Sequence, residues 1–365
     1  MSRTASCLLL VPALALALPA QQRPSAPMRQ SRAESLYVSD RPEDHPQPNF
    51  ERQILAKART DSIYRARSQG VMDFQKISYK STADGMTIPA YLFQPLKKRG
   101  PKGHAAMVWV HGGVHGDWTQ TMFPFVREAV ERGYVIIAPD YRGSTGYGAA
   151  HYNAIDYGGK EVVDVASAVE YLKTLPHVDQ DRLGIMGWSH GGYITALNLF
   201  RDQQPFKGGA SIVPVTNLVF RLSYKGPGYQ RSFSTQAGIR GLPFEKREEY
   251  LKRSPLYQVD KLQVPILVHV ATNDLDVDYV EDQQLVDALR SRKPELAETK
   301  TYVDPAPWGS SVGHAFSRRV DPETLERVDS PEQIDSWNRT WVFFEWILRP
   351  YEDRSKPAPP VRVNP

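Results

Sequence analysis

The run G-W-S-H-G-G at residues 187–192 carries the side chain of this sequence that is best suited to nucleophilic chemistry. It contains the pattern G-x-S-x-G, with Ser189 at its centre. A serine hydroxyl is a weak nucleophile at neutral pH, so a protein has to hold it on a tight turn beside a base. Glycines on both sides make room for the strand and the helix that such a turn joins. The run therefore predicts a nucleophile elbow with Ser189 as the attacking group.

The segments around this run have the properties that an elbow requires. Residues 182–186 are typical of a buried strand, and residues 193–200 are typical of a helix. Because G-x-S-x-G alone occurs by chance in roughly one unrelated chain of this length in ten, the order of strand, turn and helix is the stronger observation. The alternative is a serine in an ordinary turn, which needs no such context.

An acid and a base occur further along the chain at comparable places. Asp274 follows an apolar strand predicted at residues 265–270, and His314 lies in the loop after a short strand predicted at residues 300–303. In a parallel sheet, groups that follow strands meet at the edge formed by the carboxyl ends. We expect His314 to accept the proton of the Ser189 hydroxyl and Asp274 to orient the imidazole.

Both assignments have alternatives within the sequence. Asp276 and Asp278 stand close to Asp274, and the position of Asp274 just past the strand is what favours it as the acid. Asp276 would then serve the structure of the loop. The alternative for His314 is a packing or surface role. The order of serine, acid and histidine along the chain is the order found in α/β-hydrolases.

Backbone donors for the oxygen of a tetrahedral intermediate are predicted in the run H-G-G at residues 111–113. The run directly follows an apolar strand, where such hydrolases place a loop that offers N–H groups. We expect Gly112 and Gly113 to shape this loop and the N–H group of His190 to supply the second donor. The rings of His111 and His190 are assigned no part in proton transfer.

The remaining sequence alternates apolar runs with amphipathic ones. The apolar runs are continuous, which is typical of strands that are buried on both faces of a parallel sheet. An aromatic and glycine-rich stretch at residues 220–255 interrupts this rhythm at a place suited to a cap over the site. We therefore predict an α/β-hydrolase fold, with a mostly parallel central sheet and helices on both faces. The further predicted elements are a hairpin at 74–95, strands at 105–110, 134–139 and 209–214, and helices at 50–67, 123–132, 161–175, 280–289 and 333–348.

Composition and charge argue against several classes of function. The 365 residues include 41% hydrophobic and 24% charged residues, as in an ordinary globular protein with a sizeable core. The net charge of +4 is too balanced to indicate binding to nucleic acid or to an anionic membrane. The nine histidines are scattered and form no H-E-x-x-H run, so we expect neither a metal nor another cofactor.

The N-terminus is typical of a secretory signal. A short cationic start precedes an apolar stretch at residues 7–18, and L-P-A at residues 18–20 offers a cleavage site. The stretch is too short for a comfortable membrane span, and Cys7, the only cysteine, stands at its start rather than after it, which argues against lipidation. We expect a secreted or periplasmic protein with no membrane attachment after cleavage. The predicted segments are a signal peptide at 1–20, an N-terminal extension at 21–72, a catalytic domain at 73–350 and a disordered tail at 351–365.

Three runs occur in the order and at the spacing of one known family. They are W-V-H-G-G at residues 109–113, D-Y-R-G-S-T-G-Y-G at 140–148 and G-W-S-H-G-G-Y at 187–193. Together they resemble the catalytic domain of the prolyl oligopeptidase family of serine peptidases, in the branch of the dipeptidyl peptidases and acylaminoacyl peptidases. The resemblance extends over residues 74–351.

This resemblance implies roles for four residues. Ser189, Asp274 and His314 form the triad, and Tyr193 lies near the pocket for the residue before the cleaved bond; the alternative for Tyr193 is packing of its helix. Two features depart from the family. Its members often carry a large β-propeller, for which we expect no room ahead of the catalytic domain, so exopeptidase specificity is not implied. The pair H-V at residues 269–270 stands where His-Gly is common.

The sequence therefore predicts a serine hydrolase that cleaves peptide or amide bonds through an acyl-enzyme. A carboxylesterase on the same scaffold is the alternative, because both reactions pass through an acyl-enzyme and a fold does not fix a function. An inactive binding protein on this fold is a third possibility. The expected partner is a peptide or an acyl ester. The sequence leaves open the preferred side chain, endo- or exo-cleavage, homo-oligomerisation, and whether residues 220–255 act as a lid.

Overall fold

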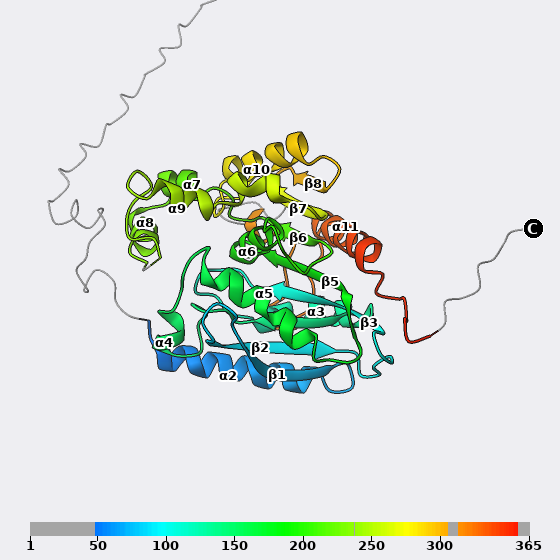
Figure 1. The fold of residues 1–365 in the computed structure, drawn as a ribbon. Helices are drawn as coiled ribbons and strands as arrows, with labels where there is room; N and C mark the ends of the chain where they lie inside the picture. Colours follow the sequence, from blue (N-terminus) through cyan, green and yellow to red (C-terminus); the bar gives the residue numbers. More distant parts are fainter. Residues whose placement is uncertain (1–47, 237, 306–312, 357–365) are drawn as a thin grey trace, which may run out of the picture.

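An eight-stranded sheet forms the centre of the computed structural model, which describes residues 48–236, 238–305 and 313–356 (Figure 1). Its strands lie in the order β1, β2, β4, β3, β5, β6, β7, β8. β2 pairs antiparallel with β1 and β4, and the other neighbouring pairs are parallel. The strands are β1 (Asp73–Lys80), β2 (Thr87–Gln94), β3 (His104–Val110), β4 (Val135–Pro139), β5 (Val178–Trp188), β6 (Gly209–Ile212), β7 (Ile266–Ala271) and β8 (Ala297–Tyr302).

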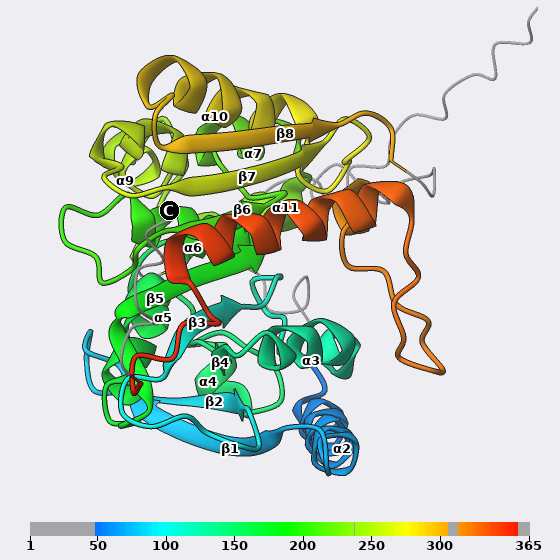
Figure 2. The same ribbon diagram turned by 90° about the vertical axis from the view of Figure 1, so that its right-hand side faces the viewer.

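Helices cover both faces of the sheet, as continuous apolar strands require. β3, β4 and β7 are buried at every residue. One apolar cluster joins one face to α5 (Lys160–Leu172), α6 (His190–Leu199) and α10 (Tyr279–Arg292). A second cluster joins the other face to α2 (Phe50–Arg67), α3 (Phe123–Glu131) and α11 (Pro331–Leu348). Figure 2 shows α3 and α11 in front of the sheet, with α5 and α6 behind it.

α2 belongs to the predicted N-terminal extension and packs directly against the sheet and its neighbouring helices. Asn49 caps the helix by accepting a hydrogen bond from the Arg52 N–H group at 2.9 Å. Tyr64 is fully buried among aromatic rings, and its hydroxyl donates to the carbonyl oxygen of Thr119 at 2.8 Å. Lys57 is also buried. Over this helix, the extension is therefore built into the domain.

The predicted interruption after β6 consists of short helices. They are α7 (Leu218–Tyr224), α8 (Pro227–Ser234) and α9 (Arg247–Lys252), followed by the 3₁₀ segment η3 (Pro255–Lys261). Two arginines connect this cap to the rest of the domain. Arg221 pairs with Glu281 of α10 at 3.3 Å, and Arg253 pairs with Asp156 at 2.6 Å.

The predicted elements agree with the observed ones to within a few residues, with one larger difference. β5 begins at Val178, four residues before the predicted start, because its polar run D-Q-D at residues 179–181 does not look like a strand in sequence. Asp179 is nevertheless fully buried, since Arg182 donates to its carboxylate at 2.9 Å. The polar start of the strand is thus stabilised by a local ion pair that an apolar pattern cannot indicate.

The two ends of the chain are described only in part. The predicted signal peptide lies outside the described residues. Residues 351–356 of the predicted tail lie against the domain: Arg182 donates to the carbonyl oxygen of Glu352 at 3.0 Å, and Arg354 pairs with Asp179 at 3.0 Å. Residues 357–365 lie outside the described part. Within the described ranges, we find no helix with both the length and the apolar character that a membrane crossing demands.

Candidate active site

Ser189 stands on a strained turn between β5 and α6, as the elbow prediction requires. Its backbone has φ 57° and ψ −123°, a conformation that is rare for a residue with a side chain. A Cβ atom on Gly187 would lie 2.5 Å from backbone atoms of Gly191. A Cβ atom on Gly191 would meet the carbonyl oxygens of Val110 and His111 at 2.6 Å or closer. Both glycines are therefore required because backbones approach closely here.

The H-G-G loop after β3 lies directly beside this turn. A Cβ atom on Gly112 would be 3.0 Å from the carbonyl oxygen of Trp188 and 3.3 Å from Cβ of Ser189. Among the described residues, no acceptor takes a hydrogen bond from the N–H groups of Gly112 and Gly113. His190 is the first residue of α6, so its N–H group has no partner within the helix and lies at the positive end of the helix dipole. The loop and the helix start thus present N–H donors next to Ser189.

Asp274 and His314 are brought together at the same edge of the sheet. The Nδ1 atom of His314 lies 2.7 Å from Oδ2 of Asp274. The other oxygen of Asp274 accepts hydrogen bonds from the N–H groups of Asp276 at 2.9 Å and Val277 at 3.0 Å. Because both residues of the pair are buried, the carboxylate has a fixed direction and can orient the imidazole.

Asp276, the alternative acid, also approaches the imidazole, but from the other side. Its Oδ2 atom lies 3.4 Å from Nε2 of His314, and its Oδ1 atom accepts a hydrogen bond from Lys225 at 2.8 Å. Partial burial works to raise the pKa of Asp276, but His314 and Lys225 outweigh it and hold that pKa below its usual value. Since its side chain is 45% exposed, Asp276 is a charged group at the surface of the site.

The Ser189 hydroxyl makes no hydrogen bond to His314 in this structure. Nδ1 of the imidazole is hydrogen-bonded to Asp274, so Nε2, which lies 3.4 Å from Asp276, is the nitrogen that would accept the proton of a nucleophile. Hydrogen bonds of catalytic groups are often long without substrate and shorten in the complex. The segments that carry Ser189 and His314 are joined by one hydrogen bond. The indole of Trp188 donates to the Ser317 hydroxyl at 2.7 Å.

The ring of His111 is enclosed by its neighbours and supports the loop. It stacks on Tyr141 with ring centroids 4.3 Å apart, and its Nε2 atom lies 2.9 Å from the Ser144 hydroxyl. Burial lowers the pKa of His111. Tyr141 donates to the carbonyl oxygen of Gly113 at 2.7 Å. Residues 140–148 therefore act as a scaffold for the H-G-G loop, which gives this run a physical role.

A buried ion pair connects the same scaffold to α2. Nζ of Lys57 lies 2.6 Å from Oδ2 of Asp140, and their side chains are 2% and 0% exposed. Burial alone would raise the pKa of Asp140, but Lys57, His111 and the Tyr147 hydroxyl together outweigh burial and keep that pKa below its usual value. The other oxygen of Asp140 accepts a hydrogen bond from the N–H group of Trp118 at 2.7 Å. One carboxylate thus holds α2, the 140–148 loop and the end of the H-G-G loop together.

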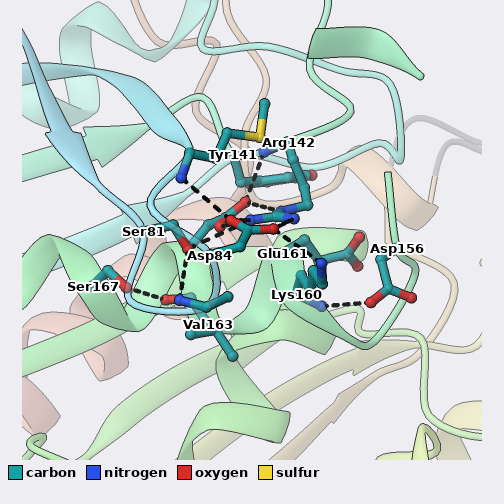
Figure 3. A network of polar contacts seen from close by, with 12 residues as sticks. Ser81, Asp84, Tyr141, Arg142, Asp156, Lys160, Glu161, Val163 and Ser167 are labelled. Atoms are coloured by element: carbon teal, nitrogen blue, oxygen red, sulfur yellow. Dashed lines mark hydrogen bonds and ion pairs between the residues drawn. The ribbon is translucent and has the colours of Figure 1, made fainter. Parts of the chain in front are cut away.

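Arg142 connects the 140–148 loop to α5, which covers the face of the sheet opposite to α2. Its guanidinium group makes two hydrogen bonds of 2.9 Å to Asp84 in the β1–β2 turn, and bonds of 2.7 and 2.8 Å to Asp164 of α5. Figure 3 shows Arg142 beside Asp84, with Lys160 near the same turn. Lys160 pairs with Asp84 at 3.0 Å. Arg142 is therefore a structural anchor for the loop that supports the site.

The side chains of His190 and Tyr193 point into the core of the domain. Nε2 of His190 lies 2.9 Å from Oε1 of Glu161. Burial lowers the pKa of His190 to about 3 and raises the pKa of Glu161 well above its usual value. Tyr193 is fully buried, and its hydroxyl donates to the carbonyl oxygen of Arg253 at 2.7 Å. These contacts fit the packing alternative for Tyr193, and its place in a substrate pocket stays a prediction.

Sequence reasoning missed several charged residues of the site. Lys57, Asp140 and Arg142 are buried by partners that are distant in sequence. One signal was available for Glu161: it stands next to Val162 and four residues before Val165, on the apolar side of its helix. A carboxylate in such a position requires a buried partner.

Comparison with known sequences identifies relatives of this chain. A profile of the prolyl oligopeptidase family matches residues 119–320, which are more than half of the chain. YuxL, an uncharacterized peptidase of Bacillus subtilis, is 30% identical over 266 residues, which are 72% of this chain and 38% of that protein. Dipeptidyl aminopeptidase BIII of Pseudoxanthomonas mexicana is 29% identical over 261 residues, which are 68% of this chain and 36% of that protein. This chain thus spans little more than a third of the length of these relatives.

Solved structures share the fold. The acylaminoacyl peptidase of Pyrococcus horikoshii matches with a TM-score of 0.61 and 22% identity, over 77% of this chain and 43% of that one. A puromycin-hydrolyzing peptidase of Mycobacterium tuberculosis matches with a TM-score of 0.59 and 23% identity, over 76% of this chain and 41% of that one. The predicted α/β-hydrolase fold is confirmed by these matches and by the mostly parallel sheet.

Proposed function

This chain belongs to the prolyl oligopeptidase family, and from that premise we propose that it is a serine peptidase in which Ser189, His314 and Asp274 cleave peptide bonds through an acyl-enzyme. The observation that carries this proposal is the 2.7 Å contact between His314 and Asp274 at the edge where the Ser189 elbow lies. The named relatives are peptidases, which favours amide bonds over esters as the target.

The proposed reaction begins with attack of Oγ of Ser189 on the carbonyl carbon of the scissile bond. Nε2 of His314 takes the hydroxyl proton, and Asp274 stabilises the resulting imidazolium. The carbonyl oxygen becomes an anion and accepts hydrogen bonds from the N–H groups of His190 and the H-G-G loop.

The first step ends when the tetrahedral intermediate collapses. His314 returns the proton to the leaving amine, so the C–N bond breaks and an ester with Ser189 remains. A water molecule then attacks this ester, again with His314 as the base, and releases the acid and the free serine. The overall reaction consumes one water molecule per bond.

This proposal is tested with purified protein and a peptide library whose products are identified by mass spectrometry. We expect cleavage at internal or terminal peptide bonds, and a loss of several orders of magnitude in Ser189→Ala. A peptide anilide and a short acyl ester are compared under the same conditions. Efficient hydrolysis of the ester with no cleavage of any peptide or anilide would assign the carboxylesterase function instead.

A further inference from the structure

A cavity of 510 Å³ opens beside the candidate oxyanion loop. Its walls come from the H-G-G loop with the residues that follow it and from the segment after His314; they include Gly112, Thr119, Trp188, Ala315 and Arg318. This volume lies within the range of pockets that bind small molecules or short parts of a larger ligand. The cavity touches the H-G-G loop at Gly112 and the loop that carries the proposed base at Ala315 and Arg318.

Arg318 is the charged group of this cavity that lies nearest to the nucleophile in the described contacts. The point where Gly112 would carry a Cβ atom lies 3.3 Å from Cβ of Ser189 and 3.6 Å from Nη1 of Arg318. The distance between Nη1 of Arg318 and Cβ of Ser189 therefore cannot exceed the sum of these two distances. The acidic residue of the cavity wall, Asp117, is paired with Lys57 at 3.2 Å.

The guanidinium group of Arg318 has no partner among the residues that the structure describes. No hydrogen bond or ion pair there involves its side chain, although the residue is half-buried. Burial lowers the pKa of Arg318, against the favourable charges of Asp276 and Asp274, and an arginine stays charged throughout. A half-buried cation with no hydrogen-bonded partner among the described residues gains from a ligand that brings a negative charge to it.

The backbone around Arg318 is held in place from both sides. The indole of Trp337 on α11 donates to the carbonyl oxygen of Ser317 at 2.7 Å, and the indole of Trp188 donates to the Ser317 hydroxyl. Gln333 accepts from the N–H group of Arg319 at 2.8 Å and donates to its carbonyl oxygen at 3.1 Å. These contacts fix the segment so that the Arg318 side chain is presented to the cavity.

Arg318 lies on the side of the site where the leaving group of the proposed reaction has to lie. In the proposed reaction, His314 gives its proton to the leaving nitrogen, so the leaving group has to lie on the side of the His314 loop. Ala315 and Arg318 follow His314 in that same loop. An extended chain advances about 3.5 Å per residue, and a guanidinium–carboxylate hydrogen bond adds about 2.8 Å. A carboxylate one residue beyond the scissile bond therefore fits the separation of Ser189 and Arg318.

We propose that Arg318 binds the free α-carboxylate of the first residue after the scissile bond, so that this protein releases single amino acids from the carboxyl ends of peptides. The proposal rests on the serine peptidase function argued above and names its substrate class. The planar guanidinium group suits a carboxylate because it can donate two parallel hydrogen bonds. A carboxamide in the same place carries no charge and loses this ion pair.

The test compares two libraries of N-acetylated tripeptides that differ only at the C-terminus, as free acid or as carboxamide. We expect the wild-type protein to release the last residue from the acid library at least about tenfold faster, which corresponds to one charged hydrogen-bonded contact of about 1.4 kcal/mol. In Arg318→Met, the ratio of acid to amide rates falls toward one, and Arg318→Lys gives an intermediate ratio. Arg201→Met, a change of an exposed arginine, leaves the ratio unchanged.

A binding measurement separates this inference from the proposed chemistry. Calorimetry with Ser189→Ala should show tighter binding of an acid tripeptide than of its amide, and the double variant with Arg318→Met should bind both alike. Equal rates for both libraries in the wild type, or an equal loss of both in Arg318→Met, would overturn the inference, because Arg318 would then serve the oxyanion or the fold. If neither library is cleaved, the peptidase proposal fails, and the preference of Ser189→Ala for the acid still decides the role of Arg318.

Discussion

The two sides of the candidate site are held in place by different means. On the nucleophile side, Ser189 follows a central strand, and the loops beside it are fastened by buried ion pairs from α2 and α5. On the base side, His314 stands on the three-residue 3₁₀ turn η4 (Gly313–Ala315), and one hydrogen bond from its Nδ1–H group to Asp274 orients its ring. Its second nitrogen lies 3.4 Å from the exposed carboxylate of Asp276.

This difference matches what each side has to do in the proposed reaction. Donors for an oxyanion stabilise it only if they are already in position, since any reorganisation would cost free energy in the transition state. A base has to exchange a proton with the nucleophile and then with the leaving group. The nucleophile side therefore holds the donors for the oxyanion in position, and the base on its short turn transfers the proton. Variants on each side should then fail in different ways, either in chemistry or in stability.

The largest effect is expected from removing the base. His314→Ala should lower kcat by about 10⁴–10⁶-fold, as in other serine hydrolases that lose a triad member. Its free energy of unfolding should change little by comparison, because Asp274 keeps its hydrogen bonds from the N–H groups of Asp276 and Val277. Peptide turnover and urea unfolding measure the two quantities separately. A variant that keeps near-normal turnover would end the assignment of His314.

The next effect separates the two carboxylates around His314. Asp274→Asn should lower kcat by about 10⁴-fold, because an amide no longer stabilises the imidazolium and favours the wrong tautomer. Asp276→Asn, the matched control, should change kcat by less than about tenfold, since its carboxylate is half-exposed and already bound by Lys225. Turnover of both variants at one pH is the measurement. The reverse ranking would make Asp276 the acid.

On the nucleophile side, the effect should appear mainly as lost stability. Lys57→Met leaves Asp140 buried without its cation, which should lower the free energy of unfolding by about 3–5 kcal/mol. Lys80→Met, a change of an exposed lysine, is the control. The double variant Lys57→Met/Asp140→Asn should recover part of the loss, because no unpaired charge remains at the fully buried position 140. Additive losses in urea unfolding would show that the two residues act independently.

The smallest effect concerns pH and a histidine beneath the base side. His269 on β7 is fully buried, and burial lowers its pKa to about 3, against about 6.5 in an unfolded chain. Between these values the unfolded state binds the proton and the folded state does not, so His269 contributes stability above pH 6.5 that is lost as the pH falls toward 3. His269→Gln should flatten the decline of unfolding free energy between pH 7 and 4. An unchanged slope would contradict this account.

The sequence predicted the parts of this molecule that depend on local pattern. Continuous apolar runs indicated strands such as β7, and the G-x-S-x-G run placed Ser189 on its turn. Asp274 was favoured by its position after a strand, and the structure brings it to His314. The order of the strands in the sheet was not predicted, because no pattern in a single sequence shows which strands pair.

The features that the sequence did not predict are charged residues whose partners are distant in sequence. Nothing near Lys57 indicates that its partner is Asp140, because the pairing exists only once α2 lies against the folded sheet. Arg318 has an ordinary sequence environment, and only the close approach of Gly112 gives it a place beside Ser189. Charges like these are recognised from burial and contacts, which a single sequence does not contain.

Covalent trapping of the nucleophile is the most direct test of the central claim. The wild-type protein and His314→Ala are treated with a fluorophosphonate, and the adduct is followed by intact mass and located by peptide mapping. We predict one adduct per chain, on Ser189, with its formation slowed by at least about 100-fold in His314→Ala, since proton abstraction by a positioned base contributes about 10²–10⁴-fold. No adduct, an adduct on another serine, or equal rates in the two proteins would contradict the account.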